Sequence, residues 1–402
     1  MNSTLNSITR RALGALGALA LAGLMDTSAM SAAPPAEEFR VYFGTSGAEA
    51  KSGIYLARLD TSSGKLTAPE RVAETLKPSF LALHPSGRFV YAVNEVDDFQ
   101  GSPVGAASAF AVDPATGRLT LLNQVSAKGT WPCHLTLDRQ GRHLLVANYG
   151  SGNVAALKIG SDGRLGEASA FVQHTGRSVH ATRQEAPHAH SVDLDAANRF
   201  AFVSDLGVDR VYVYRFDADR GTLEAHDPPF AAAKPGAGPR HFAFSPDQRH
   251  AYVVNELSQT VGAYRYDAAR GTLQELGTVS LLPEGETPRE GTGAAEVQLH
   301  PSGRFLYASN RGPNVIVVFA VDPERGTLTR VEQVSTGGDW PRHFAIDPSG
   351  RWLLASNQRS NTVVVFRVDA ATGRLTPTGQ VLDVKAPSCA VFLKVGSAPA
   401  RR

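Results

Sequence analysis

The amino-acid sequence predicts an all-β protein, a seven-bladed β-propeller with four antiparallel strands per blade. Three observations lead to this prediction: a short phrase that recurs seven times, a second phrase in phase with the first, and two chain ends that complement each other. Short runs rich in β-branched and aromatic residues, such as 89–93 and 315–319, lie between the phrases and are typical of strands.

The first phrase is Gly-x-Leu, which mostly follows an Asp-containing turn. Its copies begin at Gly64, Gly117, Gly163, Gly221, Gly271, Gly326 and Gly373. Successive copies are 53, 46, 58, 50, 55 and 47 residues apart. This spacing suits one four-stranded blade and is too long for a leucine-rich or ankyrin repeat.

The second phrase is Pro-Ser-Gly-Arg, which occurs within 84–88, 300–304 and 347–351. It is typical of a tight turn, because Pro sets the first φ angle and Gly supplies a positive one. Placing the turns between strands gives one complete unit, with strands a to d at 78–83, 89–94, 107–112 and 119–125.

The two ends of the chain complete one another. After six full units, the C-terminal run 387–393 supplies only a strand a, whereas the N-terminus supplies strands b, c and d at 40–42, 54–56 and 66–67. We therefore expect a last blade made of one C-terminal and three N-terminal strands, which leaves no sheet edge exposed. The prediction is a single propeller domain over 36–398.

Residues 1–35 have the order of a secretory signal peptide. Arg10 and Arg11 precede an apolar run at 12–24, and small residues follow at 28–33. The adjacent arginines favour the twin-arginine type. The run is too short to span a bilayer stably, so we expect cleavage, a periplasmic or secreted protein, and no membrane attachment afterwards.

Composition excludes several classes of partner. The 402-residue chain has a formal net charge of +2 and no dense Lys/Arg block, so nucleic acid is not an expected partner. Its two cysteines, Cys133 and Cys389, are too few for a disulfide framework. We expect buried thiols, although their matching places in the repeat leave a bridge across the channel as an alternative. We expect a monomer.

Within each blade, the start of strand a and the end of strand b lie side by side, opposite the Pro-Ser-Gly turn. Polar residues gather at both places. The first ring, at the starts of strands a, contains Ser79, Phe80, Cys133, His134, His188, His190, Arg240, His241, Glu296, Arg342, His343, Ser388 and Cys389. The second ring, at the ends of strands b, contains Asn94-Glu95, Asn148-Tyr149, Ser204-Asp205, Asn255-Glu256, Asn310-Arg311 and Asn357-Gln358.

The recurring Asn of the second ring fits an architectural role, because its side chain can hold turn backbone. The residue after it differs in charge from blade to blade, which indicates a ligand rather than the fold. Together the rings predict a small-molecule site at one mouth of the channel. The alternative is a solvated polar mouth without catalysis.

Several signatures are missing from the sequence. It has no Gly-x-Ser-x-Gly elbow, no P-loop and no dinucleotide fingerprint. His188 and His190 point to the same side of a strand and could bind a metal with His134 or His241. No carboxylate has matching spacing, so the expectation is neither metal nor cofactor.

A set of phrases resembles the propeller lactonase family, which includes bacterial 6-phosphogluconolactonases and fungal carboxymuconate lactonising enzymes. They are Asn148-Tyr149-Gly150-Ser151-Gly152-Asn153, Pro187-His188-Ala189-His190-Ser191, Pro239-Arg240-His241, Val254-Asn255-Glu256, Ala295-Glu296-Val297 and Asn310-Arg311-Gly312. The resemblance extends from about 39 to 395. It implies catalytic roles for His190 (or His188), Arg240, Glu256 and Arg311. We expect the remaining ring residues His134, His188, His241, Glu296, Arg342 and His343 to bind substrate.

Opening a lactone requires a base for water and a cation for the oxyanion. Glu256 or His190 fits the base, and Arg240 and Arg311 fit the oxyanion or a substrate phosphate. The resemblance implies 6-phosphogluconolactone as substrate, whereas export points to an unphosphorylated sugar lactone. The alternatives are a lactonising cyclase and a binding propeller without catalysis, because 252–255 also resembles the repeat of surface-layer propellers.

Overall fold

A computed structural model describes residues 37–47 and 52–396 of the chain. The predicted signal peptide lies at 1–35, outside these ranges, so it stays a prediction, as does the exact extent of the propeller domain. Across the described ranges, no helix is long and apolar enough to cross a membrane.

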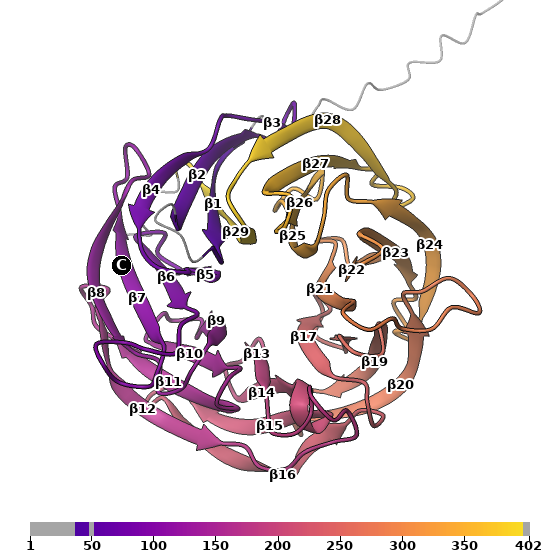
Figure 1. The fold of residues 1–402 in the computed structure, drawn as a ribbon, viewed down its shortest axis with the longest axis horizontal. Coiled ribbons are helices and arrows are strands. Elements are labelled where there is room, and N and C mark those ends of the chain that lie inside the picture. Colours follow the sequence, from indigo (N-terminus) through magenta and orange to yellow (C-terminus); the bar gives the residue numbers. More distant parts are fainter. Residues whose placement is uncertain (1–36, 48–51, 397–402) are drawn as a thin grey trace, which may run out of the picture. The chain divides into compact units, whose positions relative to one another are not determined.

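The described residues form seven antiparallel sheets arranged radially around a central axis (Figure 1). This confirms the predicted fold class. Six blades are consecutive in the chain: β5 (Phe80–Leu83), β6 (Phe89–Asn94), β7 (Ala106–Val112) and β8 (Leu119–Ser126); β9 (Pro132–Leu137), β10 (His143–Asn148), β11 (Asn153–Ile159) and β12 (Leu165–Gln173); β13 (Ala189–Leu194), β14 (Phe200–Asp205), β15 (Arg210–Asp217) and β16 (Thr222–Ala232); β17 (Pro239–Phe244), β18 (His250–Asn255), β19 (Thr260–Asp267) and β20 (Thr272–Ser280); β21 (Gly293–Leu299), β22 (Phe305–Arg311), β23 (Val315–Val321) and β24 (Leu328–Ser335); β25 (Pro341–Ile346), β26 (Trp352–Asn357), β27 (Thr362–Val368) and β28 (Leu375–Asp383). A short 3₁₀ helix, η1 (Leu206–Val208), follows β14.

The seventh blade joins the two ends of the chain, as the sequence predicts. The C-terminal β29 (Pro387–Lys394) pairs with β1 (Glu38–Thr45), and β1 pairs with β2 (Gly53–Asp60). The outer strand differs from the predicted 66–67, because it consists of two pieces, β3 (Lys65–Leu66) and β4 (Glu70–Glu74). Pro69, which has no N–H to donate, lies in the interruption.

The Gly-x-Leu glycines lie in the turns between strands c and d, where each touches the preceding blade. Gly163 has a φ of 85°, and a Cβ on it would lie 2.3 Å from the Phe89 ring. The Tyr91 hydroxyl of the same neighbouring blade donates a hydrogen bond to the Gly163 carbonyl at 3.0 Å. Tyr42, Tyr252 and Tyr307 make the same bond to the glycine of the next blade. The phrase therefore recurs because it seals one blade against the next.

The strand register places the predicted rings together at the opposite face. Pro239, at the start of β17, pairs with Asn255 at the end of β18, and Pro341 pairs with Asn357 in the same way. Three of the recurring asparagines hold backbone, as expected: the Nδ2 atoms of Asn94, Asn148 and Asn357 donate to the carbonyls of Leu76, Ala127 and Thr336. Asn255 and Asn310 donate instead to the side chains of Thr260 and Gln259. This leaves the residues around them free to differ among blades.

Candidate active site

A β-bulge at the start of strand a recurs in most blades and sets the direction of the side chains there. In β17, Pro239 pairs with Asn255 and His241 with Val254, so Arg240 is an extra residue without a partner. The extra residues in the corresponding bulges are Cys133, His190, Arg342 and Ser388. Bulges re-aim side chains and are common beside active sites. Three predicted site residues, His190, Arg240 and Arg342, thus project from bulges.

Glu256 is the centre of a cluster of guanidinium groups. Its Oε2 accepts a hydrogen bond from Arg240 Nε at 3.0 Å and lies 2.8 Å from Arg311 Nη2. Its Oε1 accepts from Arg183 Nη2 at 2.6 Å. Burial alone would raise the pKa of Glu256, but Arg311, Arg240 and Arg183 hold it well below its usual range. Glu256 is therefore a carboxylate that organises three arginines.

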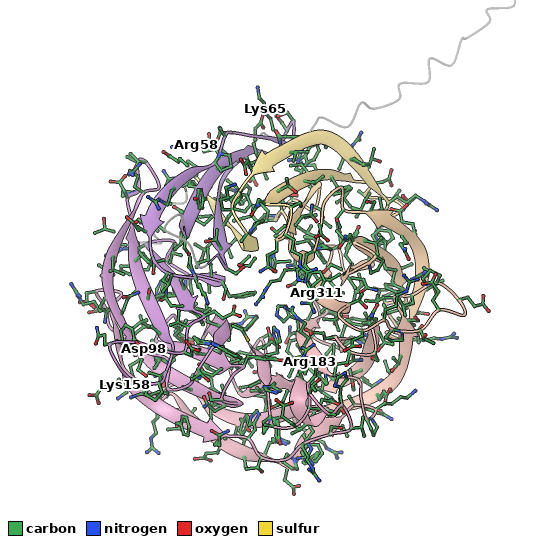
Figure 2. All side chains as sticks on the ribbon, viewed as in Figure 1. Arg58, Lys65, Asp98, Lys158, Arg183 and Arg311 are labelled. Carbon is green, nitrogen blue, oxygen red and sulfur yellow. The ribbon has the colours of Figure 1, made fainter. Side chains whose placement is uncertain are left out.

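Arg183 belongs to this cluster although sequence reasoning missed it. It lies in the connection between β12 and β13, and both Arg183 and Arg311 are found toward the centre of the ring (Figure 2). Its Nη2 also donates to the Tyr149 hydroxyl at 3.2 Å. The signal for it was indirect, because Arg183 precedes the quoted Pro187–Ser191 phrase within an unusually long connection.

A second ion pair joins two blades that are distant in the chain. Arg342 Nη2, from β25, lies 3.0 Å from Glu95 Oε2, just after β6. Burial would lower the pKa of Arg342, but Glu95 and other nearby acidic groups raise it, so this guanidinium remains charged. The pair places a further guanidinium group at the channel mouth. It also shows that Glu95, a residue of the predicted second ring, takes part in the site as the partner of Arg342.

Four histidines form a floor beneath the arginines. His241 is central, with ring centroids 5.2 Å from both His134 and His190. The Phe80 ring contacts this floor, with its centroid 4.3 Å from that of His134 and 5.7 Å from that of His343. Burial, followed by Arg240, lowers the pKa of His134 and of His343 to about 3. The same two causes hold the pKa values of His190 and His241 well below the usual range, so the floor is neutral.

Glu296 is a buried carboxyl group in contact with two histidines of this floor. Its Oε2 lies 2.8 Å from His241 Nδ1 and 3.5 Å from His343 Nε2. Arg240 Nη1 lies 3.2 Å from His241 Nε2 and can only donate, so the His241 proton is on Nδ1 and is donated to Glu296. Burial raises the pKa of Glu296 to about 8, although Arg240 acts in the opposite direction.

His188 is held differently from the floor histidines. Its Nδ1 lies 2.9 Å from the Tyr149 carbonyl, an acceptor, so Nδ1 carries the proton and the lone pair is on Nε2. The ring stacks on Tyr149 with centroids 4.5 Å apart, and Nε2 lies 3.5 Å from Glu185 Oε1. His188 is thus an oriented imidazole with a free basic nitrogen and a carboxylate beside it.

All ten residues predicted for the site are linked through these contacts and through the charges on Arg240 and Arg342. The second ring contributes unequally. Glu95, Tyr149, Glu256 and Arg311 join the cluster, whereas Asp205 caps η1 by accepting from Gly207 N and also accepts from His188 N. Both cysteines are buried free thiols. No group of three or more potential ligands within 37–47 and 52–396 is arranged to hold a metal ion.

The arrangement suits chemistry on an electron-rich, oxygen-containing substrate. Arg183, Arg240 and Arg311 carry more positive charge than Glu256 neutralises, and the floor adds none. Guanidinium groups held rigidly in a buried site can stabilise a developing oxyanion. An imidazole, that of His188 or of His190, can take a proton from water.

Comparison with known proteins identifies relatives of the whole propeller. Residues 40–392 match the family model described as lactonase, seven-bladed β-propeller. The chain is 36% identical to a 6-phosphogluconolactonase of Bacillus subtilis over 306 residues, 76% of this chain and 84% of the relative. It is 34% identical to a 6-phosphogluconolactonase of Formosa agariphila over 302 residues, 74% and 82% of the two chains. The solved structure of a periplasmic gluconolactonase from Pseudomonas aeruginosa superposes with a TM-score of 0.82 and 38% identity, covering 89% of this chain and 99% of that one.

Proposed function

We propose that this chain, which belongs to the seven-bladed β-propeller lactonase family, hydrolyses a sugar lactone where its arginines and histidines converge. The observation that carries the proposal is the trio Arg183, Arg240 and Arg311, held on one carboxylate, Glu256, above a neutral histidine floor. Because its guanidinium groups are already charged and its histidines are neutral, such a site can bind an oxygen anion without changing its own protonation state.

The reaction consumes one water molecule, and the proton that the protein takes up is released again when the lactone ring opens. The water oxygen attacks the lactone carbonyl carbon while its proton passes to an imidazole. The carbonyl oxygen becomes an oxyanion that Arg240 and Arg311 stabilise. The bond between the carbonyl carbon and the ring oxygen then breaks, and the ring oxygen takes the proton from the imidazolium. The product is an open-chain hydroxy acid.

His188 is the imidazole that best fits the base. Both oxygens of Glu256 already accept from arginines, and its depressed pKa makes it a poor proton acceptor. Burial and Arg240 disfavour a proton on His190. His188 has a free Nε2 with Glu185 close by, so an imidazolium formed there gains a counter-charge. His190 then contributes to the floor under the sugar ring.

The proposed substrates are gluconolactones, because relatives act on them with or without a phosphate, as their names state. The experiment follows acid release by purified protein from δ-gluconolactone and from its 6-phosphate, above the spontaneous rate. We expect clear acceleration with at least one of them. Rates equal to buffer with both would remove the lactonase proposal and favour a propeller that only binds.

Two histidine variants then test the base. His188→Gln should lower kcat about 10²-fold to 10⁴-fold, the range for loss of general-base catalysis. His190→Gln should change KM more than kcat. The opposite pattern would assign the base to His190. Circular dichroism and thermal melting of both variants serve as folding controls.

We also propose that the mature protein works outside the cytoplasm as a monomer, and that residues 1–35 are its signal peptide. The pattern of Arg10, Arg11 and the apolar run supports this, as does the periplasmic relative. Cell fractionation and N-terminal sequencing of the exported protein should find the chain outside the cytoplasm and starting after the small-residue stretch at 28–33. Retention of the full chain in the cytoplasm would contradict it.

A further inference from the structure

The two longest connections between blades flank the strand that carries Arg240. Residues 174–188 join β12 to β13 and residues 281–292 join β20 to β21, whereas the other connections of this kind have three to six residues. Two blades, β13–β16 and β17–β20, lie between these connections, and both connections reach the same part of the channel mouth because they line one pocket. Because three to six residues join adjacent blades elsewhere, the extra residues of these two connections are not needed for the fold.

A pocket of about 570 Å³ lies between these connections, within the range of small-molecule sites. Its lining residues are His180, Thr182, Arg183, Leu257, Pro288, Arg289, Glu290, Gly291 and Thr292. Leu257 follows β18 and belongs to the second of the two blades between the connections. The pocket is therefore built by two separate insertions together with the loop that follows β18.

Arg183 connects this pocket to the proposed catalytic cluster. Its Nη2 contacts Glu256 Oε1 and the Tyr149 hydroxyl, and the same residue lines the pocket. Gln184 anchors the backbone on either side, because its Nε2 donates to the Leu206 carbonyl at 2.9 Å and its Oε1 accepts from His180 N at 3.1 Å. Arg183 is thus held in place between the cluster around Glu256 and the pocket.

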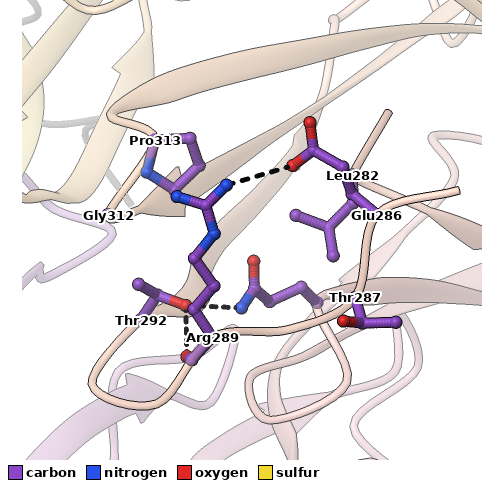
Figure 3. A pocket seen from close by; sticks show the side chains of 8 residues that line it. Leu282, Glu286, Thr287, Arg289, Thr292, Gly312 and Pro313 are labelled. Carbon is purple, nitrogen blue, oxygen red and sulfur yellow. Dashed lines mark hydrogen bonds and ion pairs between the residues drawn. The ribbon is translucent and has the colours of Figure 1, made fainter. Parts of the chain in front are cut away.

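Arg289 supplies a second cation from the opposite wall. Thr292 Oγ1 donates to the Arg289 carbonyl at 2.6 Å and accepts from Gln259 Nε2 at 2.7 Å, so the base of the connection is tied to the propeller. Figure 3 shows these bonds in a smaller neighbouring pocket, which Arg289 and Thr292 also line. Within the part of the chain that the structure describes, the guanidinium pairs with Glu286 at 3.8 Å, and both side chains are exposed. It stays available for a ligand, because exposed pairs of this kind are weak.

We propose that this pocket binds a distal anionic group of the substrate, a phosphate or a carboxylate, between Arg183 and Arg289. The inference rests on the proposed lactonase function and extends it to the substrate's other end. Arg240 and Arg183 bind opposite oxygens of Glu256, so the pocket that Arg183 lines adjoins the Glu256 carboxylate on the side away from Arg240. With the lactone carbonyl at Arg240, the distal carbon points toward Arg183 and the pocket beyond.

The test compares three lactones on Arg289→Gln: neutral δ-gluconolactone, its 6-phosphate, and glucarolactone, which carries a carboxylate. We expect kcat/KM to fall about tenfold for an anionic lactone that the pocket accepts, the size of one lost charge-assisted contact. The value for neutral δ-gluconolactone should stay unchanged. A loss with the 6-phosphate alone identifies a phosphate site, and a loss with glucarolactone alone identifies a carboxylate site.

Arg220→Gln is the matched control. Arg220 has a side chain 80% exposed, as Arg289 has, and it pairs with Asp217 three positions earlier at 3.9 Å, but it lies in a turn between β15 and β16. It should affect no lactone. Equal effects of Arg289→Gln on neutral and anionic lactones, or none on any of them, would overturn the proposal.

Calorimetric titration with 6-phosphogluconate and with glucarate separates this inference from the proposed function. If the wild-type protein hydrolyses no lactone yet binds one of these anions, and Arg289→Gln weakens that binding, the pocket stands and the lactonase proposal falls. If hydrolysis is present but neither anion binds more tightly than neutral sugar, the pocket assignment falls alone.

Discussion

The two faces of the propeller use repetition in opposite ways. At the face with the Gly-x-Leu turns, the blades repeat the same contact, as Gly163 against Phe89 and Gly326 against His250 illustrate. At the opposite face, the residue after each recurring asparagine changes from Glu256 to Arg311 between adjacent blades. Repetition marks residues that hold blades together, whereas departure from it marks residues available for a ligand.

The bulges explain how both patterns coexist in one sheet. A strand pair in regular register gives every residue a partner and repeats its geometry from blade to blade. An extra residue at the start of strand a, such as Arg240 or His190, leaves the ladder and points elsewhere without changing the pairs below it. The mouth can therefore vary while the blade core stays the same.

The largest effect should come from a change at the mouth. Arg240→Met should lower kcat/KM about 10³-fold, because it removes a preorganised donor for the oxyanion. The free energy of unfolding should fall by no more than about 1–3 kcal/mol, because the Ala295 carbonyl and His241 Nε2 lose a donor while Glu256 keeps Arg183 and Arg311. Steady-state kinetics and urea unfolding measure the two quantities.

Arg249→Met, at the turn face, is the control for that variant. Arg249 has a side chain 52% exposed and pairs with Glu324 at 3.2 Å, so its loss should alter neither kinetics nor stability much. If Arg240→Met unfolds the protein and retains activity per folded molecule, the division between the two faces is wrong.

The next largest effect concerns the turn face, where a substitution should change stability and leave activity unchanged. Gly163→Ala should lower the free energy of unfolding by about 3 kcal/mol, because the residue adopts a φ of 85° and its Cβ would meet the Phe89 ring. Gly166→Ala is the matched control, since its Cβ would make only ordinary contacts, the nearest at 3.5 Å. Neither variant should alter kcat/KM at temperatures where it is folded. A loss of activity in folded Gly163→Ala would show that the faces are coupled.

Sequence reasoning reached the fold because the repeated residues carry it. Glycine at a positive φ and an asparagine near the end of strand b in most blades leave a periodic trace in the chain. The polar rings were found as departures from that trace, including Glu256 and Arg311. Arg183 was missed because it lies in a connection without a counterpart in other blades. The bulges were missed because one extra residue per strand changes spacing less than loop lengths do.

The two faces also shift the pKa values of their carboxyl groups in opposite directions. Hydrogen bonds from turn backbone lower the pKa values of exposed aspartates such as Asp217 and Asp322. Burial raises the pKa of Asp193 to about 7 and that of Glu296 to about 8. The raised pKa values of Asp193 and Glu296 lie close to neutral pH, so these two buried groups contribute to the pH dependence of stability there.

The smallest predicted effect is a pH dependence of stability, which follows from the raised pKa of the buried carboxyl groups. The folded pKa of Glu296, about 8, exceeds the value of about 4.3 expected for an unfolded chain, so the folded state binds more protons between these pH values. The free energy of unfolding should therefore fall by up to about 2 kcal/mol as pH rises from 6.5 to 8. Below pH 6.5 the sign reverses, because His134 and His343 stay neutral when folded and take up protons when unfolded. Stability should peak near pH 6.5.

Glu296→Gln isolates the alkaline side of that peak. Urea unfolding at pH 6.5 and 8 should show a flatter decline in the variant, because glutamine has no proton to lose. The part that remains belongs to Asp193 and to thiols of the unfolded chain, which both proteins share. Parallel declines in the variant and the wild type would mean that Glu296 is already ionised at pH 6.5. His241 and Glu296 would then form a charged pair, and the histidine floor would contribute positive charge to the site.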